Sequence, residues 1–167
     1  MVYSFTFQNS TYNIGLSNAQ KGLIPNKKWK KSNLEQGWYQ GETLITSIGQ
    51  GYNLTSPLQL ASMYSALLNG GKFPSPKLIK NEPSKYLGEE LNSNHQKAIL
   101  NALKAAVQEP SGTAYKLNLD NPNFVKIGGK TGTSQVVRIK EEDREDDLYK
   151  TKEIEERFKD HSVFVGY

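Results

Sequence analysis

The strongest hydrophobic periodicity in the chain lies between residues 57 and 68. Five apolar side chains recur there at three- and four-residue spacing: Leu60, Ala61, Tyr64, Leu67 and Leu68. This spacing is typical of one face of an amphipathic helix. Ser56 and Gln59 have the spacing of a capping box around Pro57, and Asn69-Gly70-Gly71 is a typical helix stop. The pattern predicts a helix that begins after Ser56 and ends before Asn69.

A second amphipathic helix is predicted from about Asn94 to Gln108, followed by the helix-ending sequence Pro110-Ser111-Gly112. Its apolar face consists of Ile99, Leu100, Leu103, Ala106 and Val107. We expect both apolar faces to lie in the core rather than in a ligand site.

Four short runs of apolar or β-branched residues predict strands. They are Lys77–Lys80, Phe124–Ile127, Gln135–Ile139 and Ser162–Tyr167. The first 25 residues are polar and fit either a strand or a loop, and residues 141–159 are expected to be a solvated insertion, partly helical at 152–158. Because a cut inside a strand exposes unpaired backbone groups, the end of the sequence within Ser162–Tyr167 indicates a truncated piece. We expect residues 1–167 to be part of a single domain, truncated at both ends.

Composition narrows the class of protein. A chain of 167 residues with 36% apolar and 23% charged residues is typical of one globular domain, and atypical of collagen, coiled coils or disordered chains. No run approaches the roughly 20 apolar residues of a transmembrane helix, and residues 1–18 lack the basic and apolar segments of a signal peptide. The absence of cysteine excludes disulfides, thiolate metal sites and cysteine nucleophiles.

The net charge of +4 combines two oppositely charged parts. Residues 141–160 contain ten acidic and five basic residues, so the other 147 residues carry a net charge of +9. A basic surplus can attract nucleic acid, an anionic lipid or a carboxylate. The cluster Lys27-Lys28-Trp29-Lys30-Lys31 is the best candidate for a nucleic-acid site, but it has no arginine and no second aromatic residue within reach. A solvated surface is the favoured interpretation, and no nucleic-acid partner is predicted.

No metal site and no cofactor are predicted. The two histidines, His95 and His161, are 66 residues apart, and neither has a ligand partner at helical spacing. His161, at the start of the last predicted strand, is expected to be structural. The acidic residues at 141–143 and 146–147 lack the glycine and the spacing of a calcium loop.

The residue types of Lys130-Thr131-Gly132-Thr133 indicate chemistry. A phosphate-binding loop would require glycine where Phe124 stands and a helix after the motif, whereas the residues that follow favour a strand. The alternative is a strand edge beside a groove, with Lys130 and Gly132 on one face and Thr131 and Thr133 on the other unless local twist brings more of them together. An ammonium, two hydroxyls and exposed amides suit a carboxylate or a developing oxyanion, and Gly132 lets a ligand approach the backbone.

This segment resembles the K-T-G motif of penicillin-binding proteins and serine β-lactamases. Together with five other segments in the same order, it resembles consecutive landmarks of class B penicillin-binding proteins of the elongation-type PBP2 group. The six are Gly22–Pro25 followed by Trp29, Trp38–Thr43, Ile48–Tyr52, Thr55–Ala61, Lys130–Val136 and Asp160–Tyr167. The resemblance covers nearly the whole chain, from about Phe5 onward.

The resemblance implies the C-terminal part of a D,D-transpeptidase domain. Its fold would be an incomplete penicillin-binding protein/β-lactamase-like transpeptidase fold of the α/β (α+β) type, with a mainly antiparallel sheet packed by helices. Such enzymes cross-link peptidoglycan stem peptides at the periplasmic face of the inner membrane by serine acyl transfer, and β-lactams inhibit them covalently. The implied catalytic residues are Lys130 and Thr133, whose amide forms half of the oxyanion hole. Thr131, Gly132 and Thr133 are implied to bind the substrate or β-lactam, the threonines through its carboxylate.

The chain departs from the family pattern at two motifs. None of its serines begins an S-x-x-K sequence, and no S-x-N sequence occurs. We therefore expect the chain to be inactive alone and to bind a stem peptide or β-lactam only with the upstream half of the domain. The alternative is a non-catalytic binding or structural module from a split or truncated gene. Self-association through uncovered strands is also expected.

Overall fold

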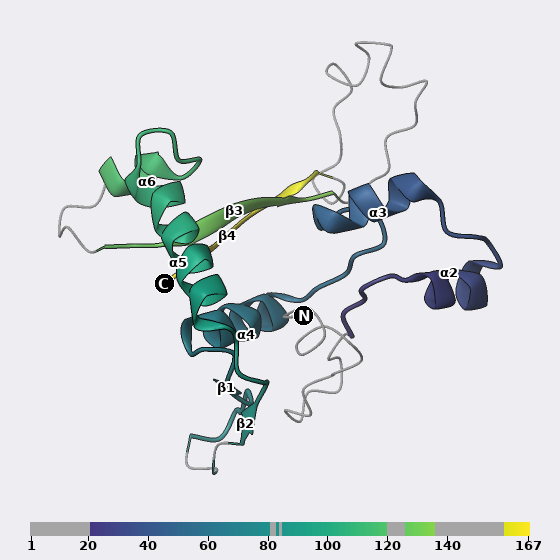
Figure 1. The fold of residues 1–167 in the computed structure, drawn as a ribbon, viewed down its shortest axis with the longest axis horizontal. Helices are drawn as coiled ribbons and strands as arrows, with labels where there is room; N and C mark the ends of the chain where they lie inside the picture. Colours follow the sequence, from purple (N-terminus) through teal and green to yellow (C-terminus); the bar gives the residue numbers. More distant parts are fainter. Residues whose placement is uncertain (1–20, 81–82, 84, 120–125, 136–158) are drawn as a thin grey trace. The chain divides into compact units, whose positions relative to one another are not determined.

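The computed structural model describes residues 21–80, 83, 85–119, 126–135 and 159–167 (Figure 1). These residues form two compact units, one that ends at Ala105 and one that begins at Ala106. The first unit contains α2 (Lys27–Leu34), α3 (Gln40–Ser47), α4 (Pro57–Leu68), β1 (Phe73–Pro74) and β2 (Tyr86–Leu87). Helix α5 (Ser93–Gln108) includes residues of both units, and the second unit contains α6 (Tyr115–Leu119), β3 (Gly129–Ser134) and β4 (His161–Gly166).

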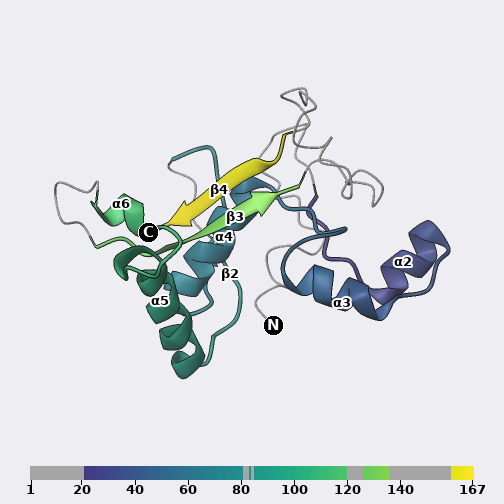
Figure 2. The same ribbon diagram turned by 90° about the horizontal axis from the view of Figure 1, so that it is seen from above.

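Both sheets in the described part of the chain are antiparallel pairs. Strand β1 pairs with β2, with Phe73 opposite Leu87. Strand β3 pairs with β4 over six residues, from Gly129 opposite Gly166 to Ser134 opposite His161, and Figure 2 shows the two strands side by side. Helices combined with antiparallel strands confirm the predicted α+β class. Among the described residues, no helix has the length and apolar character that a membrane span requires.

Helix α4 confirms the predicted helix at both of its ends. Ser56 is the N-cap, its side chain accepts from the Gln59 amide at 3.3 Å, and Gln59 Oε1 accepts from the Ser56 amide at 2.8 Å. The helix ends at Leu68, and Gly70 and Gly71 follow with positive φ angles of 66° and 102°. These contacts are local in the sequence, which explains why the pattern of residues predicts them.

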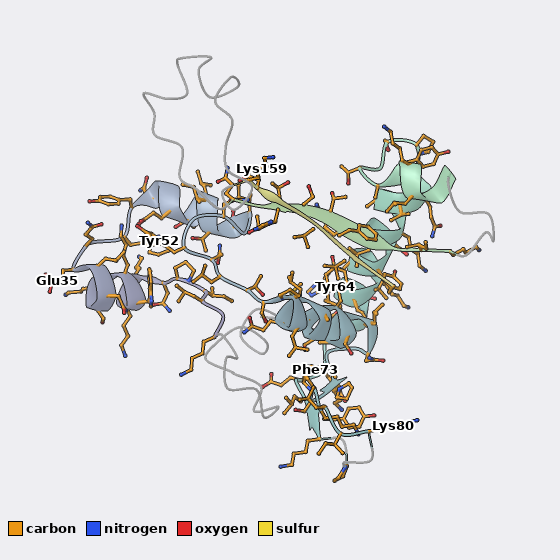
Figure 3. All side chains as sticks on the ribbon, turned by 180° about the vertical axis from the view of Figure 1, so that it is seen from behind. Glu35, Tyr52, Tyr64, Phe73, Lys80 and Lys159 are labelled. Carbon is orange, nitrogen blue, oxygen red and sulfur yellow. The ribbon has the colours of Figure 1, made fainter. Side chains whose placement is uncertain are left out.

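The buried face of α4 differs from the predicted one. The buried residues are Gln59, Ser62, Tyr64, Ala66 and Leu67; of the predicted face, Leu60 and Leu68 are half-buried, and the prediction is wrong for Ala61, which is exposed. The reason is the position of the partner: Ala66 forms a buried cluster with Phe73 of β1, which is completely buried. Figure 3 labels Tyr64 on α4 and Phe73 on the β1–β2 hairpin. The contact with this hairpin therefore accounts for the burial of Ala66.

Helix α5 confirms the second predicted helix over Ser93–Gln108. Its predicted apolar face is buried only in part: Leu103 and Val107 are 8% and 0% exposed, whereas Ile99 is 37% exposed. Within the first unit, Gln96 of α5 donates through Nε2 to the carbonyl of Leu67 at 2.7 Å. This side chain thus satisfies a carbonyl at the end of α4 that has no partner within its own helix.

The predicted strand at Lys77–Lys80 is wrong. No strand forms there, and Leu78 and Ile79 are 64% and 62% exposed. Burial of these two apolar side chains therefore contributes little to the stability of the segment. Pairing occurs instead on either side of this segment, between β1 and β2, and is extended by the Ser75 amide, which donates to the Lys85 carbonyl at 2.7 Å.

The remaining strand predictions have mixed outcomes. The last one is confirmed by β4, which begins at His161. Lys126 and Ile127 are not in a strand, since β3 begins at Gly129, and Gln135 lies just beyond its end. Four predicted segments lie outside the described residues: 1–20, 124–125, 136–139 and the helical part of the insertion at 152–158.

The basic cluster at residues 27–31 lies on α2, and two of its residues have partners from elsewhere in the first unit. The Trp29 ring lies 5.3 Å from the ring of Tyr52, so the prediction that no second aromatic residue is within reach is wrong. Lys30 is 1% exposed and forms an ion pair with Glu42 of α3. One of the four lysines is therefore not available to a nucleic acid.

Candidate functional site

The K-T-G segment forms most of β3, as the strand-edge interpretation predicts. Two glycines at the start of the strand allow it to lie against β4. A Cβ atom on Gly129 would lie 2.5 Å from the Phe164 ring, and one on Gly128 would lie 2.7 Å from the Tyr167 ring. Partial burial of Tyr167 also raises the pKa of its hydroxyl. A Cβ atom on Gly129 would also lie 2.7 Å from the Val165 carbonyl oxygen, so packing against the backbone of β4 requires glycine at position 129.

The hydrogen bonds at the start of this pair determine which backbone groups of β3 face β4. Gly128 and Tyr167 exchange both of their bonds, at 3.1 and 2.9 Å. In an antiparallel pair such positions alternate with positions whose N–H and C=O groups point away from the partner strand. With the observed register, Lys130 bonds toward β4, whereas the backbone groups of Thr131 and Thr133 point toward the opposite edge of β3.

The Lys130 side chain reaches this same edge. Its Nζ donates to the Thr131 carbonyl at 2.7 Å, although the lysine is on the other face of the strand from Thr131. The side chain is exposed, as are Gly132 and Thr133. The Lys130 ammonium thus lies along the edge of the strand toward which the Thr133 amide points. Both groups could stabilise a negatively charged oxygen there.

Gly132 differs from the two glycines that begin the strand. A Cβ atom on Gly132 would meet nothing closer than the Val163 carbonyl at 4.0 Å, and its φ is not in the positive range. Neither packing nor backbone conformation within the described residues therefore requires glycine here. Close approach of a ligand to the strand is a physical reason that fits this position.

Two residues that the sequence analysis missed also contact this segment. Gln108, the last residue of α5, donates through Nε2 to the Ile127 carbonyl at 2.9 Å. Thr113 Oγ1 lies 3.1 Å from Thr131 Oγ1. Nothing in the pattern around Gln108 or Thr113 signals these contacts, because their partners lie 19 and 18 residues away in the sequence.

The two histidines lie on different elements of the chain. His95 is exposed on α5, and His161 begins β4 opposite Ser134. In the part of the chain that the structure describes, no three histidine, aspartate or glutamate side chains are grouped as a metal site would require.

The family model described as "Penicillin binding protein transpeptidase domain" matches residues 1–167, so the chain belongs to this family. The predicted resemblance is confirmed at the level of the PBP2 group.

Individual relatives are similar over most of this chain. Peptidoglycan D,D-transpeptidase MrdA of Salmonella typhimurium is 32% identical over 166 residues, which cover 92% of this chain and 26% of the relative. MrdA of Escherichia coli K12 is 27% identical over 165 residues, which cover 92% of this chain and 25% of the relative. The chain thus spans about a quarter of the length of these curated relatives.

Solved structures of the same group share the fold. PBP2 in a complex with MreC from Helicobacter pylori matches with a TM-score of 0.73 and 26% identity, over 97% of this chain and 27% of that one. Pseudomonas aeruginosa PBP2 in complex with WCK 5153 matches with a TM-score of 0.69 and 28% identity, over 93% of this chain and 33% of that one. These likenesses confirm the predicted fold class.

Proposed function

We propose that the chain is part of a peptidoglycan D,D-transpeptidase and supplies one side of its active site. The observation that carries the proposal is the edge of β3, where Lys130 Nζ lies 2.7 Å from the Thr131 carbonyl and the backbone of Thr133 is directed away from β4. The family membership of residues 1–167 and the activity in the names of the MrdA relatives support it.

The proposed roles follow from charge and backbone direction. Lys130 attracts the carboxylate of a stem peptide or a β-lactam, and the Thr131 and Thr133 hydroxyls bind that carboxylate. The Thr133 amide stabilises the oxyanion that forms when a serine attacks the carbonyl. Gly132 leaves room for the ligand backbone. The attacking serine comes from an S-x-x-K motif, which this sequence does not contain.

The proposed partner is the upstream half of the same transpeptidase domain, of which residues 1–167 form one part. The surface of this chain that would contact the upstream half includes exposed apolar side chains of the first unit. Examples are Leu44 and Ile48 of the α3 region, which are 71% and 74% exposed. Exposed apolar surface favours association. The chain by itself should therefore self-associate, and light scattering that shows a stable monomer at high concentration would contradict this.

The proposed location follows from the substrate. Cross-linking of peptidoglycan stem peptides takes place outside the cytoplasm, so the site would act at the periplasmic face of the inner membrane. Fractionation of cells that produce the full-length protein, with an antibody against this segment, tests the location; recovery in the cytoplasm would contradict it.

Acylation of a reconstituted domain tests the function. Residues 1–167 are joined to the upstream half of the domain, and acylation by a labelled penicillin is followed with time. Lys130→Ala should slow acylation at least about tenfold, because a charged hydrogen bond contributes about 1.5 to 3 kcal/mol. Lys126→Ala, which removes an exposed lysine just before the strand, is the matched control. Equal rates for Lys130→Ala and the parent would favour the non-catalytic module.

A further inference from the structure

The hydroxyl of Thr113 is held next to the K-T-G strand by its own loop. Ala114 is 5% exposed, and its amide donates to the Ala106 carbonyl at 2.9 Å. The Gly112 amide donates to the Glu109 carbonyl at 2.8 Å, and the Tyr115 amide donates to the Gly112 carbonyl at 3.1 Å. The backbone on both sides of Thr113 is thus fixed by short hydrogen bonds, which limits where its side chain can lie.

The two hydroxyl oxygens of Thr113 and Thr131 lie 3.1 Å apart, which is a long hydrogen bond between two hydroxyls. Each hydroxyl has one hydrogen and two acceptor positions, so the bond uses only one of the two hydrogens. When Thr113 donates, the Thr131 oxygen is the acceptor and its hydrogen remains available to a ligand. A ligand carboxylate can only accept, so it selects this arrangement of the pair.

The same contact favours one rotamer of Thr131. A β-branched side chain has few χ1 states, and in a threonine a different state exchanges the positions of the hydroxyl and the methyl group. Thr131 is half-buried, whereas Lys130 and Thr133 are exposed. The side chain of Thr131 is therefore the most constrained of the three. The contact with Thr113 keeps its hydroxyl, rather than its methyl group, at this position.

We propose that Thr113 is a positioning residue that orients the Thr131 hydroxyl as a donor to the carboxylate of the ligand. This inference rests on the proposed function, because the carboxylate is that of a stem peptide or a β-lactam. Thr113 does not touch the ligand and acts only through Thr131.

Equilibrium binding to the reconstituted domain tests the proposal. The probes are a stem peptide with a free C-terminal carboxylate and the same peptide with a C-terminal amide, measured by calorimetry. Thr113→Val is isosteric and should weaken binding of the carboxylate peptide about fivefold, the effect of one lost neutral hydrogen bond. Thr113→Ser keeps the hydroxyl and should bind as the parent does. The matched control is Ser111→Ala, which removes an exposed hydroxyl from the same loop.

A double variant shows whether Thr113 acts through Thr131. If it does, adding Thr113→Val to Thr131→Val should cause no further loss, because the two hydroxyls then act as one unit. Additive effects, failure of Thr113→Ser to restore binding, or equal weakening of the amide peptide would overturn the proposal.

The penicillin acylation assay separates this inference from the proposed function. Acylation of the parent with no effect of Thr113→Val on carboxylate binding would overturn the role of Thr113 alone. A carboxylate preference that depends on Thr113 in a domain that is not acylated would overturn the proposed function alone. A parent that binds both peptides equally would overturn the role of Thr113, and one that is also not acylated would overturn the proposed function as well.

Discussion

Lys30 and Glu42 connect helices α2 and α3, with Lys30 Nζ 2.5 Å from Glu42 Oε1. The lysine is 1% exposed, and its ammonium also lies 4.3 Å from the centre of the Tyr39 ring. The other carboxylate oxygen of Glu42 accepts from the Tyr39 amide at 2.8 Å. One buried cation thus joins two helices whose packing buries little else, since no residue of α3 is buried.

Replacement of this lysine should destabilise the first unit. In Lys30→Met, Glu42 loses its ion-pair partner and the Tyr39 ring loses its cation, while the apolar stem of the side chain is kept. Urea unfolding followed by the fluorescence of Trp29 and Trp38 should show a lower midpoint. The control Lys31→Met removes an exposed charge on the same helix and should change the midpoint little. Equal midpoints for the two variants would contradict the role of Lys30.

The same pair predicts a dependence of stability on pH. The hydrogen bond from Lys30, the Tyr39 amide and the Lys30 charge all lower the pKa of Glu42 below its ordinary value of 4.5. A carboxyl whose pKa is lowered by folding stabilises the protein above its unfolded pKa, and this contribution is lost as the pH falls through the folded pKa. As the pH falls from 6 to about 3, the urea midpoint should therefore decrease less for Glu42→Gln than for the parent. Parallel pH profiles of the urea midpoint would contradict this.

Gly71 should tolerate no side chain. Its φ is 102°, and a Cβ atom there would lie 1.8 Å from the Glu89 carbonyl oxygen. We expect Gly71→Ala to lower the free energy of unfolding by more than about 2 kcal/mol, because the backbone conformation and the clash both oppose it. A Cβ on Gly37 would meet nothing within 4 Å, so Gly37→Ala is the control and should cost less than about 0.5 kcal/mol. Thermal unfolding of both variants provides the comparison.

The capping box of α4 should contribute to stability through Ser56. Ser56→Ala removes the oxygen that accepts from the Gln59 amide at 3.3 Å, and should destabilise the first unit by about 1 kcal/mol. Ser56→Thr keeps a hydroxyl at the N-cap and should recover most of the loss. Urea unfolding measures both, and a threonine variant as unstable as the alanine variant would show that the hydroxyl is not the stabilising group.

The chain alone should gain no penicilloyl mass. Thr131, Thr133 and Ser134 of β3 have hydroxyls, but none of them has a lysine three residues later to activate it. Intact mass spectrometry after incubation with penicillin should therefore show only the unmodified chain. A stoichiometric, heat-stable adduct on any of these three residues would contradict the expectation that the nucleophile lies outside residues 1–167.

The residue pattern predicts the elements whose stabilising contacts are local. The caps of α4 join residues three positions apart, and α5 and β4 coincide with uninterrupted runs of suitable residues. Short-range hydrogen bonds and side-chain periodicity depend on the neighbouring residues alone, so the pattern predicts them. The family resemblance, which rests on ordered motifs, was also accessible from the sequence and included the K-T-G segment.

Tertiary packing is responsible for the features that depend on distant partners. It buried Ala66 of α4 against Phe73, placed the strand pairing at β1 and β2 rather than at Lys77–Lys80, and joined Lys30 to Glu42. Likewise, the contact of Thr113 with Thr131 depends on where the loop after α5 meets β3. Burial and side-chain pairing between residues far apart in the chain depend on how the elements pack, and no local pattern of residue types specifies that packing.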